Sequence, residues 1–211
     1  MSNASSARIA GLAVALILSA CGQGAPNPEQ GGDKGIHDAS HGEGGAAPSG
    51  TDMHGSMASA VGADVSDTWL RKMIAHHEGA IAMTGPVIAL GGDPRVVAIA
   101  RRMAAKQRQE IEEMRRLVRK DAAPDPESAR PYAAGEKRMQ EAMAAAEGGD
   151  ASQTFLRRMI PHHRSAIAMS EIVLAQGRDE RVAAIARRIV ADQGKEIAEI
   201  ETILKASAPA S

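Results

Sequence analysis

Apolar residues recur every three or four positions through most of the chain beyond residue 64, which is the spacing of one face of an α-helix. The pattern predicts two helices within 64–120 and two more within 150–206. A turn of only a few residues separates the two helices of each pair, so each pair is expected to fold back on itself as an antiparallel hairpin. The sequence therefore predicts two helical hairpins.

Residues typical of helix starts and ends mark the predicted boundaries. Asp93 is followed by Pro94, and proline is favoured at the first position of a helix. The expected N-caps are Ser66, Asp93, Ser152 and Asp179, and the expected helix-ending glycines are Gly91 and Gly177.

The two hairpins are copies of one another. Residues 67–117 align without a gap on residues 153–203, at an offset of 86, with 27 identities in 51 positions. Four helices with complementary apolar faces predict an all-α fold, a four-helix bundle built from two duplicated antiparallel hairpins. Residues 121–149, between the copies, are expected to form a crossover loop and a short helix.

The N-terminus has the pattern of an export signal. An apolar run within residues 1–20 ends in small residues followed by Cys21, which predicts a lipoprotein signal peptide with Cys21 as the lipidated residue. An ordinary signal peptide followed by a chance cysteine is the alternative. Either way, we expect export to the periplasm or cell envelope, with a lipid anchor at Cys21 attaching the chain to the membrane.

Residues 21–63 are rich in Gly, Ser, Ala and Pro and show no apolar periodicity, which predicts a flexible tether. The tether contains five residues of types that bind late transition metals. Two interpretations of this segment are compatible with the sequence. Its side chains capture metal ions, or its composition has no function. The five residues are His37, His41, Met53, His54 and Met57.

Composition limits the classes of function. The net charge of −1 lacks the basic excess typical of nucleic-acid binding. A single Cys excludes an intrachain disulfide and a cysteine-based zinc or iron–sulfur site. Against this background, 11 Met and 7 His in a chain with 1% aromatic residues need an explanation.

Histidine and methionine recur at fixed positions on the first helix of each hairpin. In both copies Met-x-x-His-His is followed, six residues after the second His, by another Met, and helical spacing puts the four side chains toward one inner face. His is costly to bury, and Met specifies packing weakly, so a metal site is favoured over core packing. The candidate ligands are Met73, His76, His77, Met83, Met159, His162, His163 and Met169.

The second helices carry polar residues in or beside their apolar stripe. Gln107 and Gln193 occupy positions where an apolar residue is expected, and Glu110 and Glu196 border the stripe. Buried polar groups need partners, and metal-bound imidazoles usually donate their other N–H to a carboxylate or carbonyl. We therefore expect these four residues to contact the histidines as a second shell.

Ligand softness selects the metal. Thioether sulfur is a poor ligand for Mg²⁺, Ca²⁺ and Zn²⁺, whereas Cu(I) and Ag(I) accept it together with imidazole. The pattern predicts copper, preferably as Cu(I), bound for buffering, sequestration or handover by a protein that is not an enzyme. A copper-handling partner or a homo-oligomer is compatible with this role. The alternatives are a metal-dependent redox enzyme using His76 and His162 with Glu110 and Glu196, and a structural envelope lipoprotein without metal.

The segments Trp69–His77 and Phe155–His163, each followed by Ala-Ile-Ala-Met, resemble the bacterial family called "domain of unknown function 305". The resemblance covers both hairpins. It implies an exported, ferritin-like helical bundle in which some members bind copper through Met and His, and it nominates the same eight ligands. Ala75 departs from the family pattern, because Pro161 stands at the matching position of the second copy.

Overall fold

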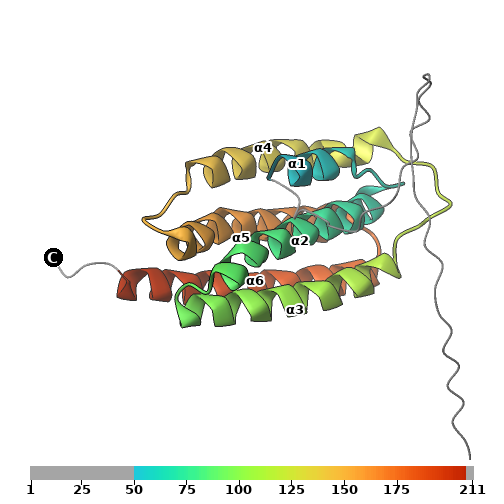
Figure 1. Ribbon diagram of the computed structural model, residues 1–211. Helices are drawn as coiled ribbons and strands as arrows, with labels where there is room; N and C mark the ends of the chain where they lie inside the picture. Colours follow the sequence, from blue (N-terminus) through green and yellow to red (C-terminus); the bar gives the residue numbers. More distant parts are fainter. Residues whose placement is uncertain (1–49, 208–211) are drawn as a thin grey trace, which may run out of the picture. The chain divides into compact units, whose positions relative to one another are not determined.

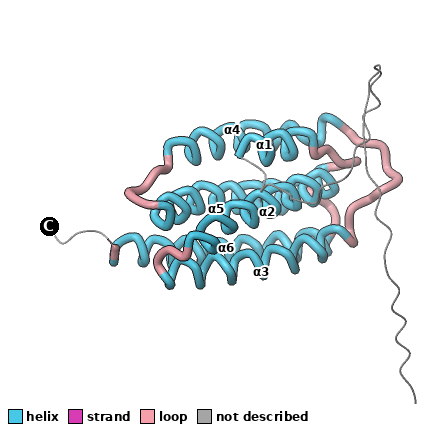
Figure 2. Tube along the Cα trace, viewed as in Figure 1, coloured by secondary structure: helices cyan, strands magenta, loops and turns pink. Residues whose placement is uncertain are grey.

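The computed structural model describes residues 50–207, and all of the regular structure in this range is helical. Figure 2 shows the helices joined by loops, with no strand in this part of the chain. The elements are α1 (Gly50–Ser59), α2 (Val65–Leu90), α3 (Pro94–Arg115), the 3-10 turn η1 (Pro126–Ala129), α4 (Arg130–Ala145), α5 (Ala151–Gln176) and α6 (Glu180–Ala206). The expectation of an all-α fold is confirmed. The predicted signal peptide, Cys21 and most of the predicted tether lie outside the described residues.

The two predicted hairpins are α2–α3 and α5–α6. Gly91 ends α2 with φ of 64°, in the left-handed region where glycine is favoured. The carboxylate of Asp93 accepts a hydrogen bond from the backbone N–H of Arg95 at 2.8 Å, and Asp179 accepts one from Arg181 at 2.9 Å. Both aspartates therefore cap their helices as predicted.

The caps of α2 and α5 differ from the prediction. Asp64 and Asp150, not Ser66 and Ser152, precede these helices, and each accepts a hydrogen bond from the backbone N–H three residues on, at 3.0 and 2.8 Å. Aspartate and serine cap equally well, so sequence preference does not separate them.

The two serines form tertiary contacts instead. Ser66 Oγ accepts a hydrogen bond from the backbone N–H of Arg178 at 3.2 Å, and Ser152 Oγ accepts one from Asp93 at 3.3 Å. The start of α2 thus lies against the α5–α6 turn, and the start of α5 lies against the α2–α3 turn. This arrangement makes α2 and α5 antiparallel.

The helices stack in three layers of two (Figure 1). The central layer is α2 and α5. One face of this layer is covered by α3 and α6, and the opposite face by α1 and α4. The four predicted hairpin helices are present, and α4 is the short helix expected within 121–149. The helix α1, and its packing with α4 as a third layer, were not predicted.

Part of the predicted tether is the helix α1. Its two large apolar side chains, Met53 and Met57, are buried against α2 and α4. They stand 86 residues before Met139 and Met143, which are buried on α4. The repeat therefore begins earlier than its strongest identities, and each copy contributes three helices. In this arrangement α4, which lies within the predicted connection between the hairpins, is the counterpart of α1.

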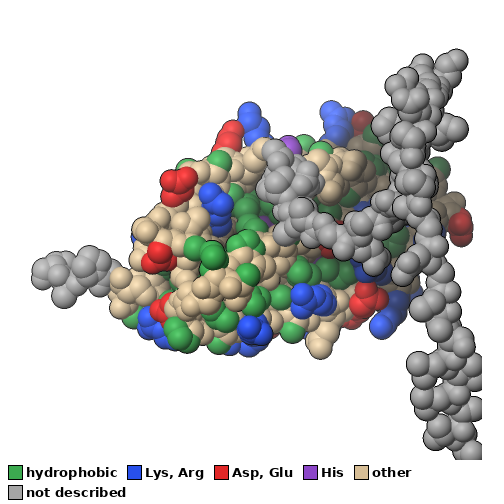
Figure 3. Space-filling view, in the orientation of Figure 1, with side chains coloured by type: hydrophobic (Ala, Val, Ile, Leu, Met, Phe, Trp, Pro, Cys, Tyr) green, Lys and Arg blue, Asp and Glu red, His purple; other side chains and the backbone are tan. Residues whose placement is uncertain are grey.

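The helices are packed by apolar residues on their facing sides, among which methionine is prominent. In the described part of the chain no helix combines the length and apolar character needed to cross a membrane. Acidic and basic side chains are interspersed over the face shown in Figure 3, with neither sign gathered into one patch.

Candidate functional site

The centre of the molecule lies between α2 and α5, where all four candidate histidines are fully buried. They come in two equivalent pairs, because each histidine of α2 has its counterpart 86 residues later on α5. Full burial of four imidazoles is costly unless their nitrogens find partners, so the partners of each ring decide what the centre can do.

His76 and His162 meet face to face across the α2–α5 contact. Their ring centroids are 3.6 Å apart, with 37° between the ring planes. Since the two residues are repeat counterparts, the local two-fold relation between the copies passes between these rings. Each copy therefore contributes one imidazole to a shared centre.

The hydrogen bonds of this pair leave three ring nitrogens without partners. Nε2 of His162 donates to the backbone carbonyl of His76 at 3.1 Å, because a carbonyl oxygen only accepts. A neutral His162 then has its lone pair on Nδ1, and that atom has no partner. Nδ1 and Nε2 of His76 have none either.

Both rings are held in the neutral form. Burial lowers the pKa of His76 well below its ordinary value, and the charges of nearby histidines would lower it further. The pKa of His162 is lowered for the same two reasons, again with burial as the larger. A neutral imidazole offers a lone pair, which is the form that binds metal ions.

His77 and His163 are held by carboxylates from the neighbouring helices. Nε2 of His77 lies 2.8 Å from Oε2 of Glu110 on α3, and Nε2 of His163 lies 2.8 Å from Oε2 of Glu196 on α6. The contact between imidazole and glutamate that was expected from sequence is thus present in both copies. Nδ1 of each ring has no partner.

Glu196 remains a carboxylate despite its surroundings. Burial opposes its ionisation, but the contact with His163 and the charge of Lys106 hold its pKa below the ordinary value. Lys106 Nζ lies 3.7 Å from Oε1 of Glu196. The carboxylate of Glu196 therefore stays charged beside Nε2 of His163.

The two glutamines do not behave as expected. Gln107 and Gln193 are buried, but neither the nitrogen nor the oxygen of the Gln107 side-chain amide has a hydrogen-bond partner, and the amide oxygen of Gln193 has none. The expected contact of Gln107 with a histidine is therefore absent, because the glutamates reach the second histidine of each pair and the first pair stacks on itself.

Four methionines flank the stacked pair along the helices. Met73, Met159 and Met169 are buried, and Met83 is half-buried. Met73 packs in the same apolar cluster as Met169, while Met83 packs against the cluster that contains Met159. Antiparallel packing of α2 and α5 thus puts thioethers from both helices on each side of the two rings.

Within the described residues, no three His, Cys, Asp or Glu side chains are grouped so that they could hold a metal ion. The carboxylates of Glu110 and Glu196 are paired with one histidine each. The donors left near the stacked rings are imidazole nitrogens and thioether sulfurs, and this set suits soft monovalent cations.

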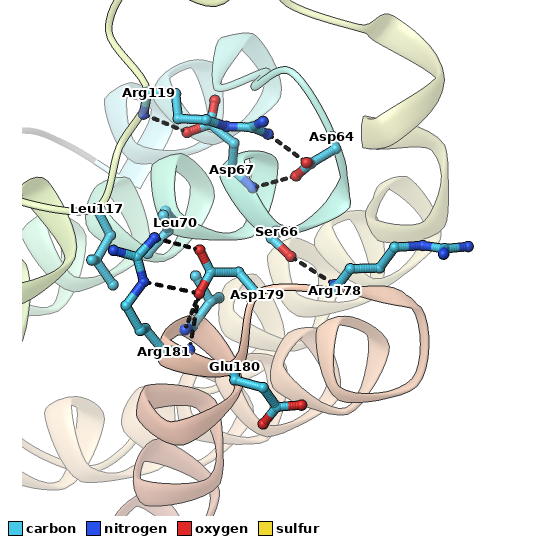
Figure 4. A pocket seen from close by; sticks show the side chains of 11 residues that line it. Asp64, Ser66, Asp67, Leu70, Leu117, Arg119, Arg178, Asp179, Glu180 and Arg181 are labelled. Carbon is cyan, nitrogen blue, oxygen red and sulfur yellow. Dashed lines mark hydrogen bonds and ion pairs between the residues drawn. The ribbon is translucent and has the colours of Figure 1, made fainter.

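A cavity of about 430 Å³ lies elsewhere, at the starts of α2 and α6 (Figure 4). Two of its arginines are already paired with aspartates: Arg181 contacts Asp179 at 2.8 Å, and Arg119 contacts Asp64 at 2.5 Å. Arg181 lowers the pKa of Asp179 to about 2, so this carboxylate stays ionised and paired. We therefore place the candidate site at the histidines.

Comparisons with known proteins bear on the fold. Residues 13–118 and 119–204 each match the sequence profile of the family described as "Domain of unknown function (DUF305)". A crystal structure of a DUF305 fragment from Deinococcus radiodurans is similar, with 26% sequence identity and a TM-score of 0.52. The similarity covers 67% of this chain and 95% of that one. No curated protein matches.

Proposed function

Because the chain belongs to the DUF305 family, whose description assigns no activity, we propose a function from its own chemistry: the protein binds Cu(I) between α2 and α5. The stacked imidazoles of His76 and His162 are the core of the proposed site. Binding there would serve buffering, sequestration or handover of the ion rather than a reaction.

One observation carries the proposal. Three nitrogens of these two fully buried rings lack partners, and a buried polar atom without a partner costs about 1–3 kcal/mol. An apolar residue would avoid that cost, but both copies have histidine. Each neutral ring has one lone pair, so a bound cation would give a partner to Nδ1 of His162 and to one nitrogen of His76, which supports a ligand role over a packing role.

The surrounding sulfur atoms favour a soft ion. Met73 and Met159 each precede a stacked histidine by one helical turn, and Met83 and Met169 follow two turns later. Thioether and neutral imidazole together suit Cu(I) or Ag(I) and are a poor set for hard divalent cations. When bound, the ion would be cargo held by soft donors and shielded from water.

Glu110 and Glu196 would act through the second histidines. A carboxylate on one ring nitrogen fixes the tautomer and orientation of the ring, as seen around many metal sites. In this proposal they hold His77 and His163 beside the stacked pair, each with its Nδ1 unengaged. Gln107 and Gln193 contribute no such contact to the proposed site.

The proposal includes the cellular location predicted from the sequence. An exported chain anchored through a lipidated Cys21 would meet copper outside the cytoplasm, where Met and His do not form the disulfides that consume thiols. We further propose that α2, α3, α5 and α6 form a four-helix core of the ferritin-like type, to which α1 and α4 are added.

The test is a competition for Cu(I). The metal-free protein is titrated anaerobically into Cu(I) held by a chromophoric chelator, next to His76→Asn/His162→Asn and the control Met103→Leu. Met103 is buried, but it is outside the predicted ligand set. We expect wild type and control to withdraw Cu(I), and the double variant to bind at least about tenfold more weakly.

A parallel titration with Fe(II) and oxygen tests the enzymatic alternative. Oxygen consumption with Fe(II), without Cu(I) binding, would favour a redox enzyme. Binding of neither metal would favour a structural role. Equal Cu(I) affinity in wild type and the folded double variant would exclude the stacked pair as the site.

A further inference from the structure

A second group of thioethers lines a pocket between the outer layer and α2. This cavity of about 290 Å³ is formed by residues of α1, α2, α4 and α5. Four of the eight described residues that line it are methionines, and one is a histidine. The lining residues used in the argument below are Met53, His54, Met83, Met139, Met143 and Arg158.

The pocket lies where the two copies of the repeat face each other a second time. Met53 of α1 and Met139 of α4 are counterparts at the offset of 86, and both line the pocket. Their helices pack against each other. As at the stacked histidines, each copy thus contributes the same residue type to a common space.

Packing alone does not account for the pocket lining. Methionine commonly fills gaps in cores, but here four thioethers border a cavity instead of closing it. Nδ1 of His54 is buried and has no hydrogen-bond partner. An imidazole nitrogen without a partner beside several sulfur atoms repeats, at the outer layer, the donor chemistry of the buried centre.

The charges around the pocket select against hard cations. Among the described residues no aspartate or glutamate lines it, and the one charged side chain among them is the cation Arg158, whose Nε donates to the carbonyl of Ala146 at 3.3 Å. A divalent ion would meet a positive charge and no carboxylate. A monovalent ion that prefers sulfur and neutral nitrogen fits better.

Two contacts connect the pocket to α2. A Cβ built on Gly79 would lie 2.1 Å from Sδ of Met53, so the thioether of Met53 rests on the α2 backbone one turn after His76. Met83 lines the pocket and also packs against both apolar clusters that flank the stacked rings. Thioethers therefore extend from the pocket toward the buried centre.

We propose that this pocket is an outer binding site for a soft monovalent cation, Cu(I) or Ag(I), with Met53, His54, Met83, Met139 and Met143 as the donor set. It shares Met83 with the buried site between α2 and α5, and its other four donors lie outside that site. It rests on the proposed function only in the choice of ion, since the geometry and donors of the pocket stand on their own.

The direct test uses Ag(I), which is redox-inert and has the same ligand preference as Cu(I). The full chain, with its methionine methyl groups labelled with ¹³C, is titrated with Ag(I) in chloride-free buffer and followed by NMR. We expect the methyl signals of Met53, Met83, Met139 and Met143 to shift, and that of Met103 to stay in place. Unmoved signals of Met53, Met139 and Met143 would overturn the proposal.

Variants separate this site from the buried one. His54→Gln/Met139→Leu removes two donors with small changes in volume, and Gln is the residue at the counterpart position 140. We expect it to bind one Ag(I) ion fewer per chain than wild type, while Met103→Leu binds as many. Unchanged stoichiometry in His54→Gln/Met139→Leu would overturn the outer site and leave the proposed function intact.

The reciprocal variant is His76→Asn/His162→Asn. If the outer site exists, this chain still shifts the methyl signals of Met139 and Met143 on addition of Ag(I). Loss of all Ag(I) binding here would overturn the outer site as an independent one. Absence of any binding in wild type would overturn both proposals.

Discussion

Lys72 on α2 and Glu136 on α4 form an ion pair that is almost completely shielded from water. Nζ of Lys72 lies 2.7 Å from Oε1 of Glu136 and also donates to the carbonyl of Met57 at 2.7 Å. The pair thereby joins α2 to both helices of the outer layer. In the second copy Arg158 stands at the position of Lys72 and is only half-buried, so the two copies attach this layer differently.

Glu136→Gln is expected to destabilise the protein because it leaves the buried ammonium of Lys72 without its counter-charge. Breaking a buried pair from one side costs about 3–5 kcal/mol. The free energy of unfolding, measured by urea denaturation with circular dichroism, should fall by that order. Glu127→Gln, which removes an exposed pair with Arg130, is the control and should cost less than about 1 kcal/mol. Equal losses of unfolding free energy in the two variants would mean that the buried pair contributes no more to stability than the exposed one.

Gly79→Ala is expected to displace α1. The added Cβ would fall 2.1 Å from Sδ of Met53, so either that side chain or the helix carrying it must move. Gly194→Ala on α6 has no atom within 4 Å of the added Cβ and should stabilise by about 0.5–1 kcal/mol, as alanine does in helices. The measurement is urea denaturation of both variants, with proteolysis of α1 as a local readout. A gain in stability from Gly79→Ala would contradict the contact.

Acidification should weaken the metal-free fold. The pKa values of His76 and His162 are lowered in the folded state, whereas the unfolded chain protonates these rings below about pH 6.5. Below that pH the unfolded state binds more protons, so the free energy of unfolding falls as the pH decreases. The loss is up to about 1.4 kcal/mol per pH unit for each ring.

Urea midpoints at about pH 7.5 and about pH 5.5 measure this effect. His76→Asn/His162→Asn serves as the comparison, because it lacks both titrating rings. Its stability should depend less steeply on pH over that interval. Parallel pH profiles for wild type and this variant would show that the two rings titrate alike in the folded and unfolded chains.

Loading with Cu(I) should raise the melting temperature, since a ligand that binds only the folded state stabilises it. At a free Cu(I) concentration about 100 times the Kd, the gain is about 2.7 kcal/mol, which shifts the melting temperature of a domain of this size by several degrees. A chelator should reverse the shift, and Zn(II) should not reproduce it. An unchanged melting curve with Cu(I) would count against the proposed function.

The hairpins could be predicted because their signals are local and strong. Asp93 and Asp179 cap the helices that follow them, and Gly91 supplies the left-handed turn. The approach of Glu110 to His77 was also predictable, since a carboxylate beside an apolar stripe needs a partner on the facing helix.

The helix α1 escaped prediction because it has little apolar surface of its own. Its burial depends on Met53 and Met57, set among small and polar residues that resemble a linker. The available signal was their match to Met139 and Met143 at the offset of 86. The stacking of His76 on His162 depends on where α2 crosses α5, and no local pattern encodes that point.

The two-fold relation at the stacked rings has a consequence for the gene as well as for the site. Each half of the chain supplies only one of the two stacked rings, so a single repeat would have to dimerise to form the same centre. Fusion makes that encounter intramolecular and independent of protein concentration. It also frees each half to mutate alone, as Lys72 against Arg158 and His54 against Gln140 already show. The duplicated chain is in effect a homodimer in a single chain, and its two halves can carry different residues at equivalent positions.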